Sequence, residues 1–104
     1  MKKLFLLTYT FACLHTYTFS LAQQSKIDSL KNILQSSKDD AHQADILNDL
    51  AWDYRTMGKY DSALFYVEQA LKLSSGINYT VGQIIALRYI GKIHEKKSDF
   101  SEAL

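Results

Sequence analysis

Apolar residues recur every three or four positions along residues 40–57, which is the spacing of one face of an α-helix. The stripe consists of Ala44, Leu47, Leu50, Ala51 and Tyr54. It predicts a helix that packs on a neighbour through this face and turns its polar face to water. Gly58 follows the stripe, and a helix C-terminus favours glycine because the backbone can adopt a left-handed conformation there. We therefore expect a tight turn at Gly58.

Three other segments show the same periodicity and are expected to be helical. A leading helix is predicted over residues 25–36, capped by Ser25, with an apolar face of Ile27, Leu30, Ile33 and Leu34. A helix over residues 60–73 is predicted to turn inward Ala63, Val67, Ala70 and Leu71. A helix over residues 80–97, capped by Thr80, is predicted to carry the stripe Ile84, Leu87, Ile90, Gly91 and His94. Residues 98–100 are expected to turn the chain into a fifth helix.

Two of these segments are related by a fixed offset of 40 residues. The residues at matching places share their size or polarity, and the clearest pairs are Leu47 with Leu87, Ala51 with Gly91, Tyr60 with Phe100 and Ala63 with Ala103. Self-similarity at one period is the signature of a protein built from stacked repeat units. The second unit reaches only Leu104, so we expect a truncated solenoid with an open C-terminal end.

The N-terminus has a different pattern. Two lysines precede an uncharged segment over residues 4–21, and the small residues Ser20 and Ala22 suit a cleavage site. This pattern predicts a secretory signal peptide over residues 1–22 and an exported protein of the periplasm or cell envelope. The alternative is an uncleaved membrane anchor, which the four threonines of the segment disfavour. Cys13 is the only cysteine, so cleavage would leave a chain without a disulfide.

Charge and residue content argue against several function classes. After cleavage the chain carries 10 Lys and Arg against 11 Asp and Glu, so no basic excess favours nucleic acid or anionic lipid. There is no glycine-rich phosphate loop and no pair of histidines at ligand spacing, which predicts no cofactor, no metal and no catalytic residue. His94 lies on an apolar stripe, where a packing role explains it better than catalysis. The prediction is a non-enzyme.

The pattern around Gly58 resembles the tetratricopeptide repeat (TPR), a pair of antiparallel helices with fixed small and aromatic positions. The residues that match are Leu47, Leu50, Ala51, Tyr54, Gly58, Tyr60, Ala63 and Ala70. The second unit departs from the motif at His94, where an aromatic residue is expected, and at Ser98, where a glycine is expected. The resemblance implies an all-α fold of antiparallel helix-turn-helix repeats, an α-solenoid fragment. Its parts are a leading helix or cap over residues 23–39, one repeat over 40–79 and an incomplete repeat over 80–104.

The resemblance also implies where a partner binds. In that family the first helix of each unit lines a concave groove, and the positions that correspond here are Asn48, Trp52, Arg55, Arg88 and Lys92. Trp52 lies one residue beyond the main stripe. It therefore either projects into the groove as an interface anchor or packs as ordinary core.

Together these features predict an exported, non-enzymatic module that binds a protein or peptide and does not bind nucleic acid. Contact with a membrane is expected only through an uncleaved N-terminus, and self-association through the open C-terminal end is a further expectation. The alternative is the N-terminal sensor region of a bacterial signalling protein such as a histidine kinase, with catalysis elsewhere.

Overall fold

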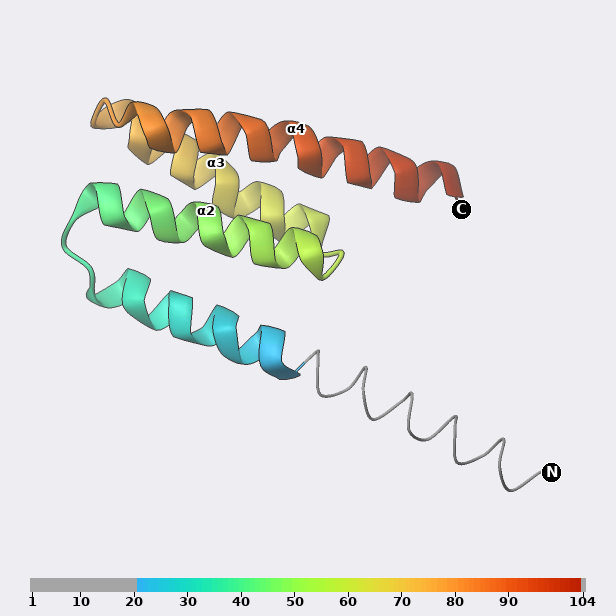
Figure 1. The fold of residues 1–104 in the computed structure, drawn as a ribbon, viewed down its shortest axis with the longest axis horizontal. Coiled ribbons are helices and arrows are strands. Elements are labelled where there is room, and N and C mark those ends of the chain that lie inside the picture. The colour runs from blue at the N-terminus through green and yellow to red at the C-terminus, as the bar shows by residue number, and fades with distance from the viewer. Residues whose placement is uncertain (1–20, 104) are drawn as a thin grey trace, which may run out of the picture.

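The computed structural model describes the backbone of residues 21–103 and the side chains of residues 21–99. A helical segment over residues 21–36 precedes α2 (Asp40–Thr56), α3 (Tyr60–Gly76) and α4 (Thr80–Ala103). Each helix runs antiparallel to the one before it in the chain, so α2 and α4 run in the same direction, with the leading helix beside α2 and α3 behind α2 and α4 (Figure 1). The predicted all-α repeat fold is confirmed. The predicted signal peptide falls almost entirely outside the described residues, as do the side chains of Phe100 and Ala103.

The first helical hairpin follows the sequence prediction closely. The carboxylate of Asp39 accepts a hydrogen bond from the Ala41 N–H at 3.0 Å and so caps α2. All five residues of the predicted α2 stripe are buried. Helix α2 ends at Thr56, and the chain turns at Gly58, which has a φ of +77° and whose N–H donates to the Arg55 carbonyl at 3.0 Å. The predicted left-handed turn is confirmed.

Small residues let α2 and α3 approach one another closely. Ala51 and Ala63 both have no exposed surface, and each contributes only a methyl group to the interface. Tyr54 fills the wider space near the turn, where its ring stacks on that of Tyr66 with centroids 5.3 Å apart. Helix α3 continues to Gly76, three residues beyond its predicted end.

The leading helix packs on α2, with two corrections to the prediction. It is already helical before Ser25, so Ser25 does not cap it. Ile27 is fully buried, whereas Ile33 is 44% exposed. The docking face is fixed by Lys26, whose Nζ bonds to Asp53 at 3.1 Å, and by Lys31, which lies over the Tyr54 ring. Ile33 lies at the edge of that face and turns outward.

Helix α4 differs most from the prediction. It is continuous from Thr80 to Ala103, so the predicted turn at residues 98–100 and the fifth helix are wrong. Thr80 is the first helical residue rather than the cap. Ser98 is compatible with a helix. Unlike Gly58 in the first unit, it does not favour the left-handed backbone conformation that ends a helix. Nothing local therefore stops the helix.

The predicted stripe of α4 is also wrong. Its buried residues are Gly82, Ala86 and Ile93, whereas Ile84 and Leu87 are 54% and 58% exposed. Gly91 and His94 are exposed, and Ile90 is half-buried. Helix α4 carries apolar residues on two faces, and it packs through the face where small side chains allow the closest approach. Within residues 21–103, no helix combines the length and apolar character that crossing a bilayer requires.

Candidate partner-binding surface

Trp52 lies at the junction of α2 and α4, where its side chain is half-buried. Its ring centroid is 4.9 Å from that of Tyr89 on α4. The guanidinium carbon of Arg55 is 4.5 Å from the Trp52 centroid, and the Nζ of Lys92 is 5.5 Å from it. Each cation–π contact of this kind contributes on the order of 0.5–1 kcal/mol at an exposed site. We call these four residues the Trp52 cluster.

Helix geometry and the repeat bring the Trp52 cluster together. Arg55 lies three residues after Trp52, and Lys92 lies three residues after Tyr89, so each pair shares one side of its helix. Trp52 and Lys92 are also separated by the 40-residue offset of the repeat. Equivalent positions on the first helices of adjacent units therefore become neighbours. Of the predicted groove residues, the structure joins Trp52, Arg55 and Lys92.

Trp52 has features of both alternatives left open by its sequence position. A ring packed as ordinary core would be fully buried, whereas the Trp52 ring is half-buried and lies against α4. The observed ring has Tyr89 on one side and two cations beside it. It is therefore held in place by the fold while part of its surface faces solvent.

Tyr89 is the member of the cluster that sequence reasoning missed. It is half-buried and is the α4 ring against which Trp52 packs. An aromatic residue one helical turn before Lys92 was the available signal. Arg88 is exposed on α4 and lies one turn before Lys92, but no described contact joins it to Trp52.

The placement of Asn48 in the groove is wrong. Asn48 is only 2% exposed, and its Nδ2 donates to the Gly82 carbonyl at 3.3 Å. Gly82 is itself required by the α3–α4 turn, because a side chain at position 82 would collide with Ser74 and Tyr79. Asn48 thus ties α2 to α4 beneath the surface. A lone glycine within a helical pattern was the sequence signal for a close approach at the α3–α4 turn.

Two of the acidic residues of α2 already have partners within the chain. Asp53 is 3% exposed and accepts from Lys26, and Asp45 accepts from the Tyr79 hydroxyl at 2.9 Å. Asp49 lies between them, and partial burial together with the charge of Asp53 raises the pKa of its carboxyl. None of these carboxylates pairs with a cation of the Trp52 cluster.

The cations of the Trp52 cluster have no acidic partner among the described residues. The ion pairs found there are Lys26 with Asp53 and Lys97 with Asp61. The buried Nε of Arg55 makes no hydrogen bond. The cluster therefore offers two positive charges beside an aromatic ring, an arrangement suited to an acidic group.

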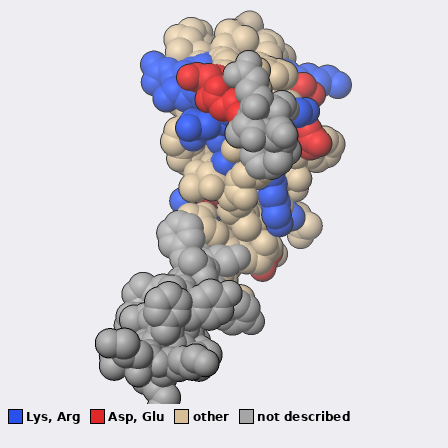
Figure 2. All heavy atoms as spheres, turned by 90° about the vertical axis from the view of Figure 1, so that its right-hand side faces the viewer, with Lys and Arg blue, Asp and Glu red and all other residues tan. Residues whose placement is uncertain are grey.

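Elsewhere the surface shows mixed charge. Figure 2 views one end of the molecule, and acidic and basic side chains alternate there without a continuous patch of one sign. Among the described residues no three His, Cys, Asp or Glu side chains gather as a metal site would require. Neither observation points to nucleic acid or a metal as a ligand.

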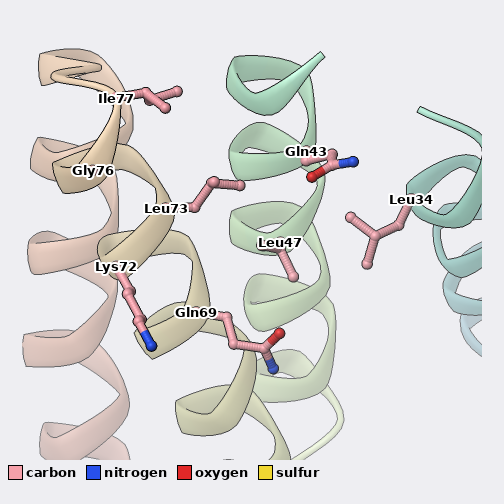
Figure 3. Close-up of a pocket in the computed structure, with 8 residues that line it drawn as sticks. All are labelled: Leu34, Gln43, Leu47, Gln69, Lys72, Leu73, Gly76 and Ile77. Carbon is pink, nitrogen blue, oxygen red and sulfur yellow. The ribbon is translucent and has the colours of Figure 1, made fainter. Parts of the chain in front are cut away.

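A separate hollow of about 680 Å³ lies between the leading helix, α2 and α3. Leu34, Leu47 and Leu73 face into it from these three helices (Figure 3). Lys72 is the one charged residue in its lining. The hollow does not include any residue of the Trp52 cluster.

The part of the chain that the structure describes is thus a helical-repeat domain with a cationic aromatic surface along the first helices of its units. A family model described as the SusR N-terminal TPR domain matches residues 15–104, and the chain belongs to this family. TPR domains are typically non-enzymatic modules of protein interaction, so membership indicates protein partners. No curated protein and no solved structure matches the chain.

Proposed function

We propose that this chain is an exported, non-enzymatic module that binds an acidic peptide segment across Trp52, Arg55, Arg88 and Lys92. The observation that carries the proposal is the Trp52 ring, which has Arg55 and Lys92 beside it, with neither cation paired to a carboxylate within residues 21–99. Trp and Arg are the residues that most often dominate interface energies. An acidic side chain of the partner would complement both cations.

The single tryptophan of the sequence makes this proposal testable. Binding beside Trp52 should change its fluorescence when the chain is titrated with a synthetic peptide of alternating glutamate and alanine. A peptide with glutamine in place of glutamate is the control and should bind more weakly. The affinity should fall as salt is added, because exposed charges are screened. Equal binding of the two peptides would contradict the proposal.

Two lysines provide a matched pair of variants. Lys92→Gln removes a cation of the Trp52 cluster and should weaken binding of the glutamate peptide. Lys72→Gln removes a cation from the separate hollow and should leave the affinity unchanged. If both variants weaken binding equally, the effect is one of net charge and the surface assignment is wrong.

Trp52→Ala tests how much of the binding energy the ring contributes. We expect a loss of about 2 kcal/mol in binding, as for an interface anchor, measured by the anisotropy of a labelled glutamate peptide. Because the ring is half-buried, circular dichroism should still show a folded helical chain. Loss of the fold would mean that Trp52 is chiefly a core residue.

Export is the part of the proposal that rests on residues 1–22. A basic start, an uncharged segment and small residues before the cleavage site support it. N-terminal sequencing of the protein from an envelope fraction should begin at Gln23. A product that retains Met1, or that occurs in the cytosol alone, would contradict cleavage and export.

A second candidate is the N-terminal sensor region of a bacterial signalling protein such as a histidine kinase. The matching family is described as an N-terminal domain, which favours this candidate. The gene sequence beyond codon 104 tests it. A reading frame that continues into a membrane helix and kinase motifs would support the candidate, and an intergenic stop would contradict it.

A further inference from the structure

The hollow between the leading helix, α2 and α3 is lined by branched apolar side chains. Leu47 lines it from α2 and is 6% exposed. Leu34 and Leu73 are half-buried and point toward one another from the leading helix and α3 (Figure 3). Ile77 lies at one end. A volume of about 680 Å³ is that of a small-molecule site, which is typically apolar with a few polar groups.

The other end of the hollow is polar and cationic. Gln69 and Lys72 extend toward it from α3, away from Ile77 (Figure 3). Lys72 is exposed and takes part in neither of the two ion pairs found within residues 21–99, although Glu68 lies one turn before it on α3. The Nε2 of Gln69 already donates to the Phe65 carbonyl at 3.4 Å. Lys72 therefore offers the positive charge that an anion would meet at this end.

We propose that the hollow binds an unbranched aliphatic carboxylate, with the carboxylate at Lys72 and the chain across the three leucines toward Ile77. An ammonium group pairs with a carboxylate through charge-assisted hydrogen bonds, and the chain is stabilised by the apolar area that it removes from water. The Gln43 amide in the lining keeps its own bond, since its Nε2 donates to the Ser37 carbonyl at 2.6 Å. This ligand differs from the acidic peptide proposed for the Trp52 cluster.

A peptide is a poorer occupant of the hollow. The middle of the hollow is formed by Leu47 and Leu73, which lie inside continuous helices, where backbone groups already bond within the helix. An extended peptide would therefore bury N–H and C=O groups without partners, which is costly. Two turns of an α-helix occupy roughly 1,000 Å³, more than the hollow holds. An alkyl chain meets neither difficulty.

A series of simple amphiphiles tests the proposal by calorimetric titration of the whole chain. Decanoate should bind saturably. Octanoate should bind at least about fivefold more weakly, because each fully buried methylene is worth about fourfold in affinity. The uncharged 1-octanol has the same chain length as octanoate and should bind about threefold more weakly than octanoate, as expected for the loss of one exposed ion pair.

Two phenylalanine variants locate the ligand. Gly76 lines the hollow, and a Cβ built there meets no atom within 4 Å, so the free chain has room for a side chain. Gly76→Phe should fill the hollow and weaken decanoate binding at least about tenfold, with an unchanged circular dichroism spectrum. Gly91→Phe adds the same ring at an exposed position of α4 outside the hollow, where a Cβ also meets no atom. It should bind decanoate as the wild type does.

Two lysine variants test the position of the carboxylate. Lys72→Gln should weaken decanoate binding about threefold and leave 1-octanol binding unchanged, whereas Lys92→Gln in the Trp52 cluster should leave both unchanged. Decanoate uptake that does not saturate, or equal decanoate affinity of the Gly76→Phe chain and the wild type, would overturn the proposal. Equal affinities for octanoate and 1-octanol would also overturn it, since Lys72 would then recognise no carboxylate.

Discussion

The two repeat units use the same motif positions to opposite effect. In the first unit, Leu47 and Ala51 are buried beside α3, and the chain reverses at Gly58. In the second unit, Leu87 is 58% exposed, and α4 runs straight through Ser98. The motif thus specifies a face, while the residue at the turn decides whether the following segment folds back to cover it. A left-handed backbone costs a residue with a Cβ about 1–2 kcal/mol, which glycine avoids.

Truncating the equivalent leucines should give the largest difference between the units. Leu47→Ala should lower the free energy of unfolding by about 3 kcal/mol, because a buried leucine leaves a cavity. Leu87→Ala should change it by less than about 0.5 kcal/mol, as exposed substitutions do. Urea denaturation followed by circular dichroism measures both. Equal losses would show that Leu87 is covered in the isolated chain.

The two glycines should respond with opposite sign. Gly58→Ala should destabilise the chain by about 1 kcal/mol, because Gly58 has a φ of +77°. Gly91→Ala should stabilise it by up to about 1 kcal/mol, since Gly91 lies in an exposed helix with open space at its Cβ. The same denaturation experiment, with helicity as a second readout, tests the pair. A destabilising Gly91→Ala would mean that a neighbour already packs against this position.

Asp49 should give the smallest effect. Its counterpart in the second unit is the uncharged Tyr89, and burial with the nearby Asp53 charge raises the pKa of Asp49 above its ordinary 3.8. The folded chain therefore holds this proton more tightly than the unfolded chain. The contribution of Asp49 to the free energy of unfolding should fall as pH rises from the ordinary pKa of an aspartate through the raised pKa of Asp49.

Asp49→Asn should remove that part of the pH dependence and raise stability at neutral pH by no more than about 0.5 kcal/mol. The quantity to measure is the difference in free energy of unfolding between variant and wild type, at a series of pH values through the acid range. Taking this difference removes the opposite contribution of Asp61, whose pKa is lowered by its hydrogen bond to Lys97. If this difference in free energy does not depend on pH, the raised pKa of Asp49 is contradicted.

The first hairpin could be predicted almost completely from the sequence, because the apolar stripe of α2 and the glycine at the turn indicate the same helix end. The α2 stripe, the start of α3 and the reversal at Gly58 could all be predicted from residues 40–63. Helix α4 could not be predicted as well, because Ala86 and Ile93 lie on one face while Ile84 and Leu87 lie on another. Periodicity identifies both faces but does not say which one meets α3.

The candidate site was predictable to the extent that it depends on spacing within a helix. Trp52 and Arg55 share a side of α2 for that reason, and the 40-residue offset brings Lys92 to them. The burial of Asn48 could not be read from its own position in α2. It depends on how closely the Gly82 backbone approaches from another helix, which is a property of tertiary packing.

The length of α4 has a mechanical consequence. Its 24 residues span about 36 Å, against about 26 Å for the 17 residues of α3, at a rise of 1.5 Å per residue. The helix therefore projects about 10 Å further than its support, and the bond from Lys97 to Asp61 lies near the start of α3. If helix α4 pivots at its Thr80 end, this exposed ion pair lies far out along the moving part of the helix. A tilt of about 10° along its length would move its tip by about 6 Å, so a small change at the packed end becomes a large displacement at the other.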